Sequence, residues 1–152
     1  MRLIPGACGG FLIAVLWMDL IFDSQVLRRR GGDELPQAVL SSIADYYHRA
    51  TTTSRPMSYL IAAVMVILLG TLGFRAAHGD DPGWLIVVLA TLAGVPILLA
   101  LIRTVPNAVA LGNRTGTPAE QSRLARSICL DHLVCLAGMS AFLVVWLVFA
   151  RT

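Results

Sequence analysis

Residues 128–150 read ICLDHLVCLAGMSAFLVVWLVFA, an apolar run long enough to cross a bilayer that still carries Asp131 and His132 near its start. Three similar apolar runs lie at residues 3–22, 57–74 and 84–102. Each of the four runs approaches the ~20 residues that a helix needs to span the hydrocarbon, and none shows the alternation of a membrane β-strand. The chain is therefore expected to cross the membrane with four helices.

The composition indicates the same class of protein. The 152 residues are 57% hydrophobic with a mean hydropathy of +0.74, which is too apolar for a soluble domain. Backbone in lipid must satisfy its own hydrogen bonds, which favours an all-α bundle. We therefore predict one integral membrane domain over residues 1–152. The net charge of +3 is attributed to topology and contact with anionic lipids, not to nucleic-acid binding.

The arginines predict the orientation of the chain. Nine of the twelve fall between the first and second runs or between the third and fourth, namely Arg28, Arg29, Arg30, Arg49, Arg55, Arg103, Arg114, Arg123 and Arg126. The other three, Arg2, Arg75 and Arg151, lie on the opposite side. By the positive-inside rule both connections are cytoplasmic and both termini lie outside a bacterial-type inner or plasma membrane.

Both arginine-rich connections also contain helix signals. In the first, apolar residues recur every four positions from Leu35 to Tyr47 behind Pro36, which predicts an amphipathic helix over residues 36–50. In the second, residues 117–120 (TPAE) place a capping threonine before a proline and a glutamate. The fourth helix is therefore expected to begin several turns before the membrane.

This topology brings the polar residues of all four helices to the cytoplasmic end. Ionisable side chains inside a span are costly unless they are paired or line a cavity, so Asp19, Asp131 and His132 are functional candidates. Asp23, one turn after Asp19, lies at the membrane boundary and is predicted to be solvated. We expect one polar pocket formed by Asp19, His48, Arg103, Asn107, Asp131 and His132.

Two kinds of chemistry suit such a pocket. Carboxylate and imidazole are good ligands for a divalent metal such as iron, manganese or zinc, with Asp19, His48 and His132 as candidates. However, the adjacent Asp131 and His132 point about 100° apart on a helix, which disfavours both as ligands of one ion. Without a metal, His132 accepts a proton, Asp19 is its charge partner and Arg103 stabilises the anion formed. The structural alternative is that Arg103 neutralises Asp19 or Asp131.

The order of these features supports a family resemblance. An acidic residue ends the first helix, Tyr47-His48-Arg49 approaches the second, Arg103 to Asn107 follows the third, and His132 opens the fourth. In this the chain resembles the small four-helix membrane proteins related to anthrone oxygenases. The basic segment 28–32 is not part of the matching pattern.

The resemblance implies a monooxygenase that oxidises an electron-rich aromatic or polyketide-like molecule with molecular oxygen, with no assigned cofactor. Matching positions are Asp19, His48, Arg49, Asn107 and His132. Catalysis is assigned to His132, Asp19 and Arg103, and substrate contact to Tyr47, His48, Arg49, Asn107 and Asp131.

Two classes of non-enzyme compete with this interpretation. The chain can be an accessory subunit of a larger membrane complex, whose partners would meet the ionisable groups. It can also form a small homo-oligomeric transporter or proton path, which intramembrane Asp and His residues equally suit. In every case the lipid bilayer is a partner, and the enzyme hypothesis adds a hydrophobic small molecule.

Overall fold

The computed structural model describes residues 3–27, 34–79 and 81–149, and these form helices joined by short turns, without strands. The predicted all-α fold with four membrane-length helices is confirmed. They are α1 (Leu3–Leu27), α3 (Arg55–His78), the span that begins with α4 (Gly83–Leu99), and α6 (Pro118–Phe149). The predictions that involve Arg2, residues 28–33, Ala150 and Arg151 fall outside the described residues.

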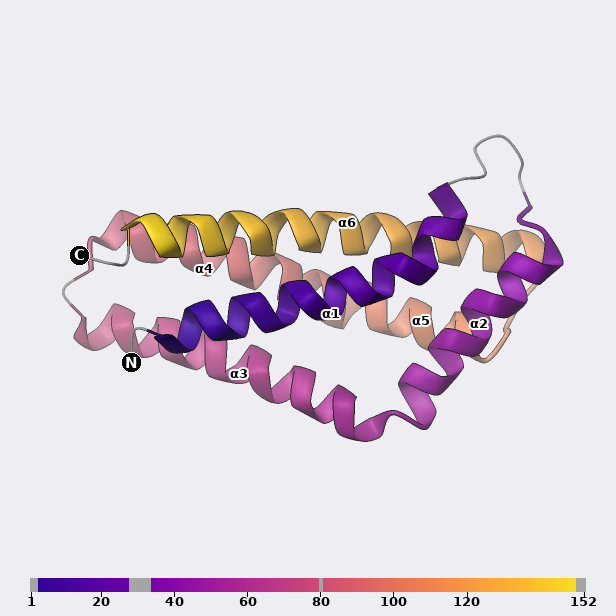
Figure 1. Ribbon diagram of the computed structural model, residues 1–152, viewed down its shortest axis with the longest axis horizontal. Helices are drawn as coiled ribbons and strands as arrows, with labels where there is room; N and C mark the ends of the chain where they lie inside the picture. Colours follow the sequence, from indigo (N-terminus) through magenta and orange to yellow (C-terminus); the bar gives the residue numbers. More distant parts are fainter. Residues whose placement is uncertain (1–2, 28–33, 80, 150–152) are drawn as a thin grey trace.

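The four long helices form an up-and-down bundle. Helix α1 packs against α6 and α3, and α4 packs against the same two helices. The start of α1, the turn between α3 and α4 and the end of α6 lie at one end of the molecule, and α2 lies at the other (Figure 1). The connection 113–117 between α5 and α6 lies at the same end as α2 (Figure 1). Which end faces the cytoplasm remains a prediction.

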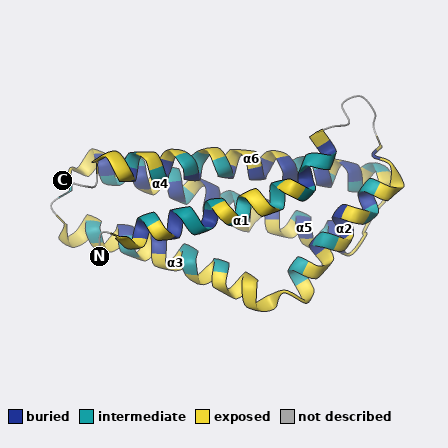
Figure 2. Cartoon of the chain, viewed as in Figure 1, coloured by how far each residue is buried: buried dark blue, intermediate teal, exposed yellow. Residues whose placement is uncertain are grey.

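The core of the bundle is apolar along most of its length. It is built around side chains such as Leu12, Leu68, Leu89 and Phe142. Figure 2 shows buried positions on the inner faces of the helices and exposed positions outside, with α3 exposed over most of its surface. Exposed apolar side chains are expected on a helix that faces lipid, because lipid is as apolar as they are.

Both predicted helical extensions are present. Helix α2 (Gln37–Thr52) buries its apolar stripe, including Leu40 and Tyr47, against α5 (Val105–Gly112). Helix α6 begins at Pro118 behind the predicted capping box. There the Thr117 N–H donates to Glu120 Oε2 at 2.7 Å, and the Glu120 N–H donates to Thr117 Oγ1 at 3.3 Å.

The third span does not end at residue 102 as predicted. It continues through a π-helical segment, η1 (Ala100–Thr104), directly into α5. Pro106 lacks the N–H that an α-helix would use and its ring crowds the preceding turn. A π-turn is a common accommodation of such strain and is frequent at functional sites. It leaves Thr104 buried, on the side of the helix that faces α6.

Helices α2 and α5 lie in close contact at Gly112. A Cβ atom built there would lie 2.8 Å from the backbone nitrogen of His48, a distance that side chains do not tolerate. Gly94, in the middle of α4, has no atom within 4 Å of the same position. Of these two glycines, Gly112 alone is required by packing.

We expect Gly112→Ala to destabilise the protein by about 1–3 kcal/mol, because the added methyl group pushes α2 away from α5. Gly94→Ala should leave the stability equal or raise it by up to ~1 kcal/mol, since alanine favours helix. Thermal unfolding of both variants in nanodiscs measures the difference. Equal melting temperatures would contradict the close docking of α2.

Candidate functional site

His132 lies on α6 between two carboxylates of α1. Its side chain is nearly enclosed, with 7% of the residue exposed. The ring atom Nδ1 lies 2.7 Å from Asp23 Oδ2, within hydrogen-bond distance. The other ring nitrogen, Nε2, lies 3.8 Å from Asp19 Oδ2, which is too long for a hydrogen bond. Because Asp19 and Asp23 are one turn apart, one face of α1 supplies both carboxylates.

Two consecutive tyrosines of α2 complete this arrangement. The Tyr47 hydroxyl donates to Asp23 Oδ1 at 2.7 Å, and the Tyr46 hydroxyl donates to Asp19 Oδ1 at 2.5 Å. The Tyr46 ring also stacks on Phe22, with ring centroids 4.0 Å apart. The result is a continuous series of polar groups, called the histidine cluster below. Its members are Tyr46, Asp19, His132, Asp23 and Tyr47.

The partners of His132 determine what its ring can do. Asp23 is completely buried, and an ionised carboxylate only accepts hydrogen bonds, so Nδ1 is assigned as the donor to Asp23. In the neutral ring the lone pair then lies on Nε2. This is the tautomer that a general base requires, with a carboxylate holding the ring in orientation. Asp19 lies next to Nε2, where it would offset a positive charge on the ring.

A second group of polar residues lies on another face of α6, around Asp131. The Arg103 guanidinium pairs with Asp131 Oδ1 at 3.0 Å, and the Thr104 hydroxyl donates to Asp131 Oδ2 at 3.3 Å. Arg103 also donates to Ser127 Oγ at 3.0 Å. The Asn107 amide reaches the same oxygen at 3.5 Å. These five residues are called the Asp131 cluster.

The predicted single pocket is therefore divided in two. Asp19 and His132 converge as expected, but Asp131 belongs to another face because neighbouring residues of a helix point ~100° apart. Arg103 accompanies Asp131, so the structure supports its neutralising role and not the predicted role beside His132.

His48 and Arg49 were also expected at the site, but both are exposed on α2. They are directed away because α2 docks through the stripe that contains Leu40 and Tyr47. Tyr47, predicted to contact substrate, is buried and bonded to Asp23 instead.

Sequence reasoning missed Asp23, which it treated as a solvated boundary residue. The structure buries it fully between Tyr47 and His132. The available signal was its i, i+4 relation to Asp19, which places both on one face. The position of Asp23 at the end of the span nevertheless predicted contact with water. Helix α2 covers this end of the bundle, and the sequence did not indicate that docking.

The candidate metal ligands do not gather around one point. His48 is exposed, while the carboxylates of Asp19 and Asp23 already accept hydrogen bonds from tyrosines. Within residues 3–27, 34–79 and 81–149 no group of three His, Cys, Asp or Glu side chains is arranged to hold a metal ion. The residues of this site thus do not fit a divalent metal such as iron, and no chemical step is assigned to one.

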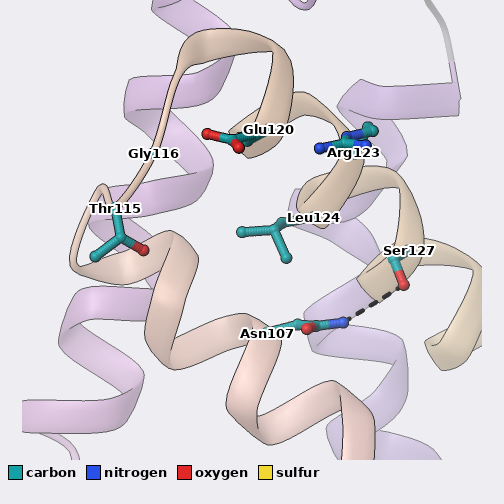
Figure 3. A pocket seen from close by; sticks show the side chains of 7 residues that line it. All are labelled: Asn107, Thr115, Gly116, Glu120, Arg123, Leu124 and Ser127. Atoms are coloured by element: carbon teal, nitrogen blue, oxygen red, sulfur yellow. Dashed lines mark hydrogen bonds between the residues drawn. The ribbon is translucent and has the colours of Figure 1, made fainter.

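An open groove lies beside the Asp131 cluster, between the end of α5 and the start of α6 (Figure 3). Its volume is about 600 Å³. It shares Asn107 and Ser127 with the Asp131 cluster but no residue with the histidine cluster. Its lining residues are Asn107, Thr115, Gly116, Glu120, Arg123, Leu124 and Ser127.

Comparison of the chain with protein-family models, curated proteins and solved structures gave no match.

Tyr47 of α2 lies outside the membrane-spanning helices. Burial, reinforced by the charge of Asp23, raises the pKa of the Tyr47 phenol above its ordinary value of ~10. The neutral phenol is favoured in the folded protein, so its stabilising contribution is complete below ~pH 10 and is lost as the pH rises further.

The absorbance at 295 nm measures phenolate, and the difference between the wild type and Tyr47→Phe isolates the contribution of Tyr47. At pH 10.5, about half a unit above the ordinary phenol pKa, we expect this difference to show no phenolate in the folded protein. The signal should emerge after unfolding in dodecyl sulfate. A phenolate signal of Tyr47 in the folded protein at that pH would contradict the buried bond to Asp23.

Proposed function

We propose that the protein is a membrane-embedded oxygenase that oxidises a hydrophobic, enolisable aromatic molecule with molecular oxygen, using His132 as the general base. The observation that carries this proposal is the pairing of Nδ1 with the buried Asp23 while Nε2 has no hydrogen bond to Asp19. The resemblance to anthrone oxygenases supplies the class of substrate.

The chemistry needs only a base and oxygen. Nε2 of His132 takes a proton from a C–H group next to a conjugated carbonyl, which leaves a delocalised carbanion. The carbanion transfers its electrons to O₂ and forms a C–O bond, and the peroxide takes back the proton from His132. Loss of water then converts the methylene group to a carbonyl, so that the four electrons removed from carbon reduce one O₂.

The other members of the histidine cluster have defined tasks in this scheme. Asp23 holds the ring in the reactive tautomer, and Tyr47 holds Asp23. Asp19 offsets the charge of protonated His132, while Tyr46 positions Asp19. The imidazolium itself remains beside the substrate anion and stabilises it, a task that the sequence had assigned to Arg103.

The substrate would approach from the lipid side at Asp19. The Asp19 side chain is 20% exposed, more than His132 or Asp23. Its neighbours on α1, Trp17, Met18 and Ile21, are exposed apolar side chains. An apolar aromatic dissolved in the bilayer would meet this surface, and oxygen partitions into the same phase. We place the site near the cytoplasmic face of a bacterial-type plasma membrane, with both termini outside, on the arginine bias alone.

The test uses anthrone as the probe, with protein in nanodiscs and dissolved ¹⁸O₂. We expect formation of the quinone with one ¹⁸O atom in the new carbonyl and the other in water. Replacement of the base in His132→Ala should lower the rate by about 100- to 10,000-fold, the usual contribution of general-base catalysis. Mass spectrometry of the product and oxygen uptake give the rate.

The matched control is His78→Ala, which removes a histidine at the opposite end of the bundle and should leave the rate unchanged. His132→Gln keeps a polar side chain and guards against loss of folding, which circular dichroism checks. Folded His132 variants that oxidise anthrone at the wild-type rate would overturn the proposal. The cluster would then be structural, as an accessory subunit requires.

A further inference from the structure

We propose that the groove between α5 and α6 binds the phosphoethanolamine headgroup of a membrane phospholipid. The position of the groove and the charges along its wall support this assignment. It is independent of the proposed oxygenase activity.

The position of the groove places it at the level of lipid headgroups. Helix α6 has 32 residues and is therefore about 48 Å long, whereas the hydrocarbon of a bilayer is ~30 Å thick. About 18 Å, or roughly twelve residues at 1.5 Å each, must project beyond the hydrocarbon. Glu120, Arg123 and Ser127 all fall within the first ten residues of α6.

One part of the groove suits a phosphate. Arg123 lines it as an exposed guanidinium, and the Asn107 amide lies beyond Leu124 (Figure 3). The Ser127 hydroxyl lies one turn further along α6, within reach of the Asn107 amide. Arg103, paired with Asp131, also donates to the Ser127 hydroxyl and keeps a half-exposed side chain, so a second guanidinium lies close by. Guanidinium, amide and hydroxyl groups are the donors that phosphate oxygens accept.

The other part suits a primary ammonium. Glu120 lies on the same wall as Arg123, one turn earlier in α6 (Figure 3). Its capping bonds with Thr117 both use Oε2, at 2.7 and 3.1 Å. The other carboxylate oxygen is not used by the capping box, so a donor from a headgroup can be added without loss of the cap.

The wall therefore carries one negative and one positive charge, and it matches a zwitterion better than an anion. An anionic phosphatidylglycerol would pair with Arg123 but bring no cation to Glu120, which would then share Arg123 with the phosphate. Phosphatidylcholine carries both charges, but its quaternary ammonium has no N–H to donate to Glu120. Phosphatidylethanolamine supplies the phosphate and the donating ammonium together.

Native mass spectrometry of the detergent-solubilised protein tests this directly. The probes are phosphatidylethanolamine, phosphatidylglycerol and phosphatidylcholine with identical acyl chains, together with soluble glycerophosphoethanolamine and inorganic phosphate. We expect phosphatidylethanolamine to bind about tenfold more tightly than either other lipid, the size of one hydrogen bond to a charged group. The two soluble probes should bind more weakly than the lipid.

Two variants assign the binding to the groove. Arg123→Gln should weaken phosphatidylethanolamine binding about tenfold. Glu120→Gln should abolish the preference over phosphatidylglycerol, and it keeps the helix start because glutamine also completes a capping box. Arg55→Gln, at the start of α3 and outside the groove lining, is the control and should bind like the wild type.

Three results would overturn the proposal. Equal or tighter binding of phosphatidylglycerol by the wild type would contradict the zwitterionic match. Wild-type lipid preference in both folded groove variants would place the lipid elsewhere. Soluble glycerophosphoethanolamine or phosphate binding as tightly as the lipid would mean that the occupant is not a membrane lipid.

Discussion

The structure depends on the need to balance the Asp23 carboxylate, which is completely buried at one end of a membrane bundle. An unpaired charge at such a position costs several kcal/mol. Tyr47 and His132 meet this need from two different helices. One carboxylate thereby fixes the docking of α2 on α1 and the rotation of α6 about its axis. Once α6 is set in this way, Asp131 must face η1, where Arg103 and Thr104 bind its carboxylate.

The sequence predicted the parts of the fold that depend on local signals. The four apolar runs, the TPAE capping box and the four-residue periodicity after Leu35 each correspond to a helix in the structure. The convergence of Asp19 with His132 also followed, because topology alone brings both to the same end. These signals are contained in single segments, so they can be recognised without knowledge of their neighbours.

The sequence did not predict how each helix is rotated about its axis or how α2 docks on the bundle. The burial of Asp23 and the exposure of His48 both depend on which face α2 presents to the bundle. The continuation of the third span through η1 was hidden for a different reason, since Pro106 indicates a helix end and a π-turn alike. The separation of Asp131 from His132 was foreseeable from helix geometry, but grouping polar residues by depth alone concealed it.

The two proposed roles, proton transfer and lipid binding, lie on different faces of α6. His132 faces the enclosed tyrosine and aspartate series, whereas Ser127 and Arg123 face a groove at the surface. The Asp131 cluster connects the groove to the interior through Arg103. A molecule bound in the groove would therefore contact residues that hold η1 against α6, without touching the histidine cluster.

The most direct measurement of the central claim is the protonation of the two His132 ring nitrogens, observed by ¹⁵N nuclear magnetic resonance in lipid and assigned with His132→Gln. We predict a proton on Nδ1 that is hydrogen-bonded to Asp23, and we expect the ordered N–H signal of this proton to disappear in Asp23→Asn. A ring that carries its proton on Nε2 alone, with a bare Nδ1, would contradict it.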